Sequence, residues 1–344
     1  MEQDNINLII QNAIYSKRNN NIKEENKLIE NFQKSIMLNY ALLNETNEID
    51  LENNNGYNLD KSIIEKIINR YLNMIPLINE ERESIITKNN LLTSKIYSSL
   101  GIIHVIFDGN TYTMLELILL GILTHNTIIF SSNGYMHGTN NLLINLIQTI
   151  LEKENYQKEM FQHSFTIRPE DFFDNFKTIN KTIIIGNADF QNKYKKLCAN
   201  SMLVSGYNNY DIYIDDLEHI ETINKIINQN HNIDIYVKSE LGLNNDNMVL
   251  VEDIDEAITQ INFNGSGYSS SIFTKNNNNA AKFIKNIDSK NVFVNASPTL
   301  EQQLDIKQED LLKEKNIILS NIYKSDGTNV NVDINQIIKN PVTN

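Results

Sequence analysis

The residue with the most obvious chemical potential is a single thiol, Cys198. A thiolate can act as the nucleophile in acyl transfer, whereas free cysteine is also among the most buried side chains, so Cys198 could equally be a packed core residue. One cysteine can form neither an intramolecular disulfide nor a zinc or iron–sulfur cluster. The six histidines lack the spacing of metal ligands. We expect no metal site and a reducing, cytoplasmic location.

Two turns could present backbone donors to an anionic ligand. Gly186 follows the apolar run 182–185, and Gly265, Ser266 and Gly267 form a second turn. Glycine lets a phosphate approach the backbone closely, but a lone glycine at a strand end is more simply a turn. Neither turn establishes a phosphate site by itself.

The charge balance limits the classes of partner. The chain has 344 residues, with 30 Lys and Arg against 43 Asp and Glu, and a formal net charge of −13. Such a chain repels polyanions, so nucleic-acid binding is not expected. The most apolar window, 114–123, contains Glu116 and is about half the ~20 residues that a membrane span requires. It predicts a buried helix, and no membrane partner is expected.

The hydrophobic pattern changes near residue 91. Before it, apolar residues recur at three- and four-residue steps over 5–43 and 59–86, which predicts amphipathic helices. After it, short β-branched runs alternate with helical stretches, which predicts βαβ units and a mostly parallel sheet. The tail from Pro298 looks helical to about Lys315 and then strand-like.

These patterns predict an α/β protein in four parts. They are an N-terminal helical region over 1–90, a Rossmann-like nucleotide-binding-type domain over 91–229, a shorter α/β domain over 230–297 and a C-terminal tail over 298–344. The run 211–215 is assigned here to the first α/β domain. At roughly 150 residues per domain, the length is compatible with two or three domains.

Several segments carry a family resemblance. VEDIDEAITQINFNGSGYSSSIFT, which starts at Val251, and VFVNAS, which contains Asn295, resemble the signature block and the Val-Asn-Ala-Ser strand of gamma-glutamyl phosphate reductase (glutamate-5-semialdehyde dehydrogenase), a family of the aldehyde dehydrogenase superfamily. Further similar segments are SLGIIHVIF (99–107), THNTIIF (124–130), KKLC (195–198) and DIYID (211–215). The resemblance covers about residues 91–300 and implies an aldehyde-dehydrogenase-like fold, with a Rossmann-like domain and a second, truncated catalytic-type domain.

The reaction that this resemblance implies is NADPH-dependent reduction of an acyl phosphate to an aldehyde, through a thioester on a cysteine, in proline biosynthesis. The family's nucleophile lies downstream of the strand that resembles 211–215. Here the corresponding helix ends near Asn228, and the following segment runs to the signature block without a cysteine. Cys198 instead aligns with the upstream Lys-Leu-Cys helix. The nucleophile position is therefore interpreted as deleted, although Cys198 stays a candidate.

The implied cofactor cradle is also altered. The family's Arg-Gly-Gly-Lys is replaced by Ser131, Ser132, Asn133 and Gly134, and its glycine-rich turn before Lys-Leu-Cys retains only Gly186. Ser131, Ser132 and Gly186 are the remaining candidates for contacts with NADPH, and Asn295 is the remaining match to the catalytic-domain motif.

Two hypotheses remain open. The chain could be a diverged, catalytically impaired reductase of this type, or a non-catalytic pseudoenzyme that acts as a binding or assembly subunit. Proteins of the superfamily associate through strands, so the resemblance implies a homo-oligomer or a complex with an active paralogue.

Overall fold

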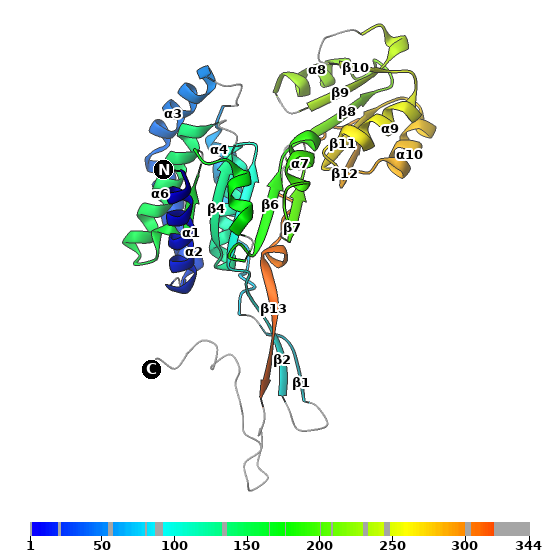
Figure 1. The fold of residues 1–344 in the computed structure, drawn as a ribbon. Helices are drawn as coiled ribbons and strands as arrows, with labels where there is room; N and C mark the ends of the chain where they lie inside the picture. Colours follow the sequence, from blue (N-terminus) through cyan, green and yellow to red (C-terminus); the bar gives the residue numbers. More distant parts are fainter. Residues whose placement is uncertain are drawn as a thin grey trace.

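The structure is a computed structural model with two parallel five-stranded sheets and a separate three-stranded antiparallel sheet. The description covers residues 2–19, 22–53, 58–79, 81–86, 92–132, 136–164, 166–175, 177–199, 201–207, 209–229, 233–243, 248–299 and 304–319. Figure 1 shows the two parallel sheets in separate lobes, with the antiparallel sheet projecting away from both.

The first sheet has the strand order β5-β4-β3-β6-β7, and every pairing in it is parallel. Buried β-branched runs form its central strands, as the alternating pattern predicts. Its strands are β3 (Ile102–Phe107), β4 (Thr127–Ser132), β5 (Phe161–His163), β6 (Lys181–Ile185) and β7 (Met202–Ser205), and its connecting helices are α5 (Thr111–Thr124), α6 (His137–Lys153) and α7 (Ala188–Lys195).

The N-terminal helices cover both faces of this sheet. Ile6, Ile10 and Ala13 pack on one face, while α2 and α4 pack against α5 and α6 on the other. Helix α5 is buried almost all round, because it lies between the sheet and these helices. The bounds are α1 (Glu2–Asn19), α2 (Glu25–Leu38), α3 (Tyr40–Asn53) and α4 (Lys61–Leu72).

The second sheet has the order β10-β9-β8-β11-β12, again with every pairing parallel. Helices α9 and α10 pack on one face and α8 on the other. The strands are β8 (Tyr210–Ile214), β9 (Ile233–Lys238), β10 (Met248–Val251), β11 (Ser269–Phe273) and β12 (Asn291–Val294), and the helices are α8 (Ile220–Gln229), α9 (Ile254–Asn264) and α10 (Asn277–Asn286).

The predicted boundary at 229/230 differs from the sheet membership. Strand β8, assigned from the sequence to the first α/β domain, pairs with β9 and β11 of the second sheet. The change of sheet therefore falls in the short segment between Ser205 and Tyr210. Local periodicity identifies a strand but does not specify its neighbours, which explains the error.

The antiparallel sheet, called the arm below, corrects two further predictions. It consists of β1 (Glu81–Ile86), β2 (Leu92–Ser99) and β13 (Leu312–Leu319), in the order β1-β2-β13. The predicted helix over 59–86 ends at Leu72, and its last residues form β1. The C-terminal segment is not helical to Lys315, because β13 begins at Leu312 after a short 3-10 turn.

Candidate functional site

The two parallel sheets meet end to end, and below the carboxyl or amino edge of a sheet means the side on which its strands end or begin. Strand β7 ends at Ser205 and β8 begins at Tyr210, so the carboxyl edge of the first sheet faces the amino edge of the second. The Gln191 side-chain amide lies 3.4 Å from the Ser266 backbone oxygen. A Cβ atom on Gly206 would lie 2.5 Å from that same oxygen, so Gly206 permits this close approach. Ligands of open α/β sheets bind at the carboxyl ends of the strands. The candidate site is therefore the inter-sheet face, where the carboxyl end of the first sheet faces the amino end of the second.

Ser131 and Ser132 end β4 at this edge, with their hydroxyl groups already hydrogen-bonded. His104 Nε2 lies 2.9 Å from Ser131 Oγ, and His163 Nε2 lies 3.2 Å from Ser132 Oγ. Burial lowers the pKa of His104 to about 3 and, together with His137, that of His163 to about 4. Both imidazoles are therefore neutral near pH 7 and supply no positive charge for a phosphate.

The amino terminus of α6, next along the chain, holds a carboxylate of the protein itself. Asp50 of α3 accepts hydrogen bonds from the backbone nitrogens of Gly138 (3.0 Å) and Thr139 (2.8 Å) and from the Thr139 hydroxyl (2.7 Å). A helix amino terminus attracts anions, and Asp50 occupies this one. Sequence reasoning did not single out Asp50, because no local signal links α3 to residues 88 positions away.

Gly186 ends β6 at the same edge, where its surroundings are filled by protein. A Cβ atom there would lie 2.7 Å from the Phe190 ring. The Asn187 side chain caps α7 by accepting from the Phe190 nitrogen at 3.0 Å, and Gln191 donates to the Gly186 oxygen at 2.9 Å. The close packing of α7 against this turn therefore explains why residue 186 is a glycine. Asn133 and Gly134, named with the serines from the sequence, lie outside the described residues.

Cys198 lies at the opposite edge of the first sheet. It follows α7, which carries the chain back from the carboxyl end of β6 to the amino end of the parallel strand β7. The thiol residue is buried, and its backbone nitrogen donates to the Tyr194 oxygen at 3.1 Å. The structure therefore does not bring Cys198 together with Ser131, Ser132 and Gly186.

Strand β9, which follows α8 along the chain, begins at the amino end of the second sheet and therefore at the inter-sheet face. The resemblance placed the missing nucleophile in this part of the chain. Residues 230–232 of the connection are Asn, His and Asn and lie outside the described residues.

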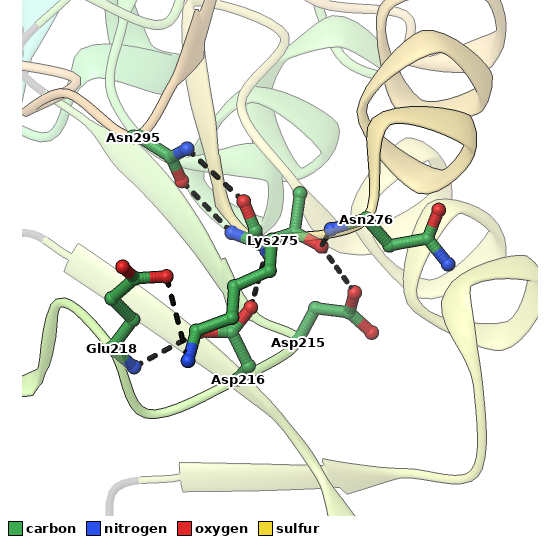
Figure 2. Close-up of polar contacts among 7 residues, drawn as sticks. Asp215, Asp216, Glu218, Lys275, Asn276 and Asn295 are labelled. Carbon is green, nitrogen blue, oxygen red and sulfur yellow. Dashed lines mark hydrogen bonds and ion pairs between the residues drawn. The ribbon is translucent and has the colours of Figure 1, made fainter.

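Asn295 lies at the far edge of the second sheet, directly after β12. Its side-chain oxygen accepts from the Thr274 nitrogen at 2.9 Å, and its amide donates to the Thr274 oxygen at 3.0 Å, as Figure 2 shows. Asn295 itself has a left-handed backbone, with φ of 53°. At about 3.3 Å per residue, the five residues of β11 place this cluster roughly 15 Å from the inter-sheet face.

Carboxylates complete that cluster. Asp215 accepts from the Thr274 hydroxyl at 2.5 Å and from Asn279 at 2.8 Å, and Asp216 accepts from the Lys275 backbone nitrogen. The Lys275 ammonium lies 3.5 Å from Glu218 (Figure 2). The cluster joins the carboxyl ends of β8, β11 and β12. Both the oxygen and the nitrogen of the Asn295 side chain bond the backbone of Thr274, which follows β11. Asn295 thus holds two strand ends together.

A second feature that sequence reasoning missed is a buried carboxylate on α5. Glu116 accepts from Arg70 Nη1 at 3.1 Å, from the Tyr71 hydroxyl at 3.0 Å and from the Tyr207 hydroxyl at 2.5 Å. Burial raises its pKa, while hydrogen bonds from Tyr207 and the charge on Arg70 act against that shift. Tyr207 belongs to the segment between the two sheets, so the network connects α4, α5 and the inter-sheet segment.

The described part of the chain holds neither a cluster of metal ligands nor a membrane-spanning helix. Among the described residues, no three His, Cys, Asp or Glu side chains lie together in a way that could hold a metal ion. None of the helices that the structure describes is both long enough and apolar enough to cross a membrane.

Comparison with known proteins agrees with this architecture. The aldehyde dehydrogenase family model matches residues 247–306. Gamma-glutamyl phosphate reductase of Brachyspira hyodysenteriae is 24% identical over 334 residues, covering 80% of this chain and 77% of the relative. The enzyme of that name from Thermodesulfovibrio yellowstonii is 54% identical over only 54 residues, 16% of this chain and 13% of the relative.

Solved structures show the same fold. The gamma-glutamyl phosphate reductase of Thermotoga maritima superposes with a TM-score of 0.61 at 17% identity, covering 93% of this chain and 99% of that one. The glyceraldehyde-3-phosphate dehydrogenase of Methanocaldococcus jannaschii, solved with NADP, has a TM-score of 0.67 at 14% identity, covering 93% and 95%.

Two parallel sheets that meet end to end, with a projecting arm, define an aldehyde-dehydrogenase-like fold, and residues 247–306 match the aldehyde dehydrogenase family model. In sequence, the chain is similar to the gamma-glutamyl phosphate reductases.

Proposed function

We propose that this chain uses the aldehyde dehydrogenase scaffold as a non-catalytic binding or assembly subunit. The observation that carries the proposal is the position of Cys198, the chain's single thiol, at the sheet edge opposite the inter-sheet face. A thioester mechanism needs the thiolate within reach of both the acyl group and the hydride donor. Cys198 is separated from that face by the length of the first sheet.

The cofactor site supports the same proposal. A neighbour of this fold was solved with NADP, and the family resemblance implies NADPH. In this chain the described residues at the carboxyl ends of β4 and β6 do not fit a dinucleotide phosphate. The Asp50 carboxylate accepts hydrogen bonds from the backbone at the amino terminus of α6. The Ser131 and Ser132 hydroxyl groups are hydrogen-bonded to neutral histidines. Phe190 packs over Gly186.

The arm supports a role in assembly. Among the described strands, β13 pairs only with β2 and forms one edge of the sheet. Ile318 on β13 is 63% exposed. Exposed strand edges pair readily with other chains. The partner in this proposal is a second copy of the chain or an active paralogue in the cytoplasm. The net charge of −13 argues against nucleic acid.

Thermal denaturation with NADPH and with NADH tests the cofactor part. A ligand that binds the native state raises the melting temperature through mass action. We expect no shift with either dinucleotide at concentrations that shift an authentic gamma-glutamyl phosphate reductase. A saturable shift with NADPH would refute this part of the proposal.

A diverged reductase is the second candidate. The family model matches residues 247–306, so the signature block persists although the nucleophile does not align. This candidate requires turnover of an acyl phosphate, or semialdehyde oxidation in reverse, with loss of activity in Cys198→Ser.

A further inference from the structure

A cavity of about 390 Å³ lies between the two lobes on the side of α4 and α5. Tyr71 and Leu120 contribute from those helices, Tyr268 and Lys290 from the amino edge of the second sheet, and the segment 304–309 closes another side. None of the described lining residues belongs to β4 or β6. The cavity thus borders the inter-sheet face at the amino ends of β11 and β12, away from Ser131, Ser132 and Gly186.

Hydrogen bonds fix the walls of this cavity. Gln308 donates to the Ile75 oxygen at 3.0 Å and accepts from the Leu77 nitrogen at 3.0 Å, which joins the 304–309 segment to the end of α4. Asn291 donates to the Tyr268 oxygen at 3.3 Å across the strand ends. Small-molecule sites are largely preformed in this way, and their volumes run from about 300 to 1,000 Å³.

The lining has an apolar floor and a charged rim. Tyr71, Leu120 and Tyr268 are buried, and Met74 and Leu77 extend the apolar surface. The rim carries two ammonium groups and two carboxylates, from Lys290, Lys307, Asp305 and Glu309. A ligand that offered only one sign of charge would meet a like charge on this rim.

Lys290 and Asp305 hold each other only loosely. The Lys290 ammonium lies 3.4 Å from the Asp305 backbone oxygen and 3.7 Å from its carboxylate. An ammonium group has three donors and forms shorter bonds with a well-placed carboxylate, typically about 2.7–2.9 Å. Asp305 Oδ1 also accepts a hydrogen bond from the Ser205 hydroxyl. The Lys290 ammonium and the second Asp305 oxygen, Oδ2, therefore retain capacity to bind a charged partner of opposite sign.

We propose that the cavity binds a small zwitterion with an apolar body, of the size and charge of an apolar α-amino acid. Its carboxylate contacts Lys290 or Lys307, its ammonium contacts Asp305 or Glu309, and its side chain packs on the Tyr71, Leu120 and Tyr268 floor. This proposal names the class of ligand for the binding role proposed above. Binding at the cavity does not depend on whether the chain has lost catalysis.

The test is thermal denaturation and calorimetric titration of the full chain with L-phenylalanine and L-leucine. N-acetyl-L-phenylalanine lacks the ammonium and phenethylamine lacks the carboxylate. We expect a saturable rise in melting temperature with at least one amino acid, and binding at least roughly tenfold weaker for both single-charge analogues. No shift with either amino acid at about 10 mM, or an analogue that binds equally well, would overturn the proposal.

Two variants locate the binding. Lys290→Met removes one ammonium, and Met74→Trp fills the cavity without changing its charge. Both should weaken binding at least roughly tenfold, with circular dichroism confirming that the fold is kept. Lys285→Met, an exposed lysine on α10, is the matched control and should bind normally. Unchanged affinity in folded Lys290→Met and Met74→Trp would show that the ligand binds elsewhere and would refute the assignment.

Discussion

The hydroxyl of Tyr207 donates a 2.5 Å hydrogen bond to Oε1 of Glu116, a carboxylate whose side chain is 0% exposed. This bond ties the segment between the two sheets to a helix in the core of the first lobe. Arg70 and Tyr71 of α4 bind the other carboxylate oxygen, so Glu116 depends on groups from two separate parts of the chain.

Tyr207→Phe should therefore lower the free energy of unfolding by roughly 2 kcal/mol, the magnitude for a hydrogen bond to a charged group. Urea denaturation monitored by circular dichroism measures the change. Tyr15→Phe is the control and should be neutral, because Tyr15 is 58% exposed. Equal stabilities of Tyr207→Phe and the wild type would show that Glu116 does not need this donor.

Asp50→Ala should destabilise the protein by about 1–2 kcal/mol, because it removes the side chain that caps α6. Glu52→Ala, an exposed change on the same helix, should be close to neutral. The midpoints of urea denaturation compare the two variants. Similar midpoints for both would contradict the capping role of Asp50.

Asp211 should make stability fall as pH rises. Burial, followed by the charge on Asp234, raises the pKa of Asp211 to about 7, although Ser270 donates to it at 3.1 Å. In the unfolded chain the pKa of an aspartate is about 3.9. Between this pKa and that of the folded state, the folded protein binds more protons than the unfolded chain, so stability declines as pH rises.

Asp211→Asn isolates this effect from the other buried groups. Urea denaturation at pH 5, 6, 7 and 8 should show the variant gaining stability relative to the wild type as pH rises, with a slope of at most about 1.4 kcal/mol per pH unit below the folded-state pKa. A constant difference between the two proteins across this range would show that Asp211 does not titrate there.

The arm gives a prediction about assembly. Ile318→Lys places a charge on the exposed β13 edge, where burial of an ion against a partner is costly. Light scattering after gel filtration should give a multimeric mass for the wild type and a smaller mass for the variant, with unchanged circular dichroism. A wild-type chain that is monomeric when purified alone would leave only assembly with a paralogue. A multimer that Ile318→Lys leaves intact would contradict assembly through this edge.

Most of the strands could be predicted from the sequence, because buried parallel strands such as Ile102–Phe107 are continuous apolar runs. The pairing of Tyr210–Ile214 with the second sheet could not, since it depends on long-range register. For a related reason, strand β1 was missed and the start of β13 was predicted a few residues too late in the chain. They pair with β2 in an antiparallel sheet whose two outer strands lie far apart along the chain.

The candidate site was predicted less well than the fold. Ser131, Ser132 and Gly186 do share one sheet edge, but Cys198 and Asn295 lie at two other edges. The residues that fill the first edge, Asp50 above all, act through tertiary contacts that leave no local pattern. A family resemblance predicts which positions match a motif. It does not predict that Asp50 binds the amino terminus of α6, because that contact forms only in the folded chain.

The most direct measurement is the phosphate- and NADP-dependent oxidation of glutamate-5-semialdehyde, together with NADPH oxidation in the presence of an acyl phosphate. The purified chain, Cys198→Ser and an authentic gamma-glutamyl phosphate reductase would be assayed side by side. We predict turnover by the authentic enzyme and none by either form of this chain. Turnover by the wild-type chain that Cys198→Ser abolishes would contradict the proposal and make Cys198 the nucleophile.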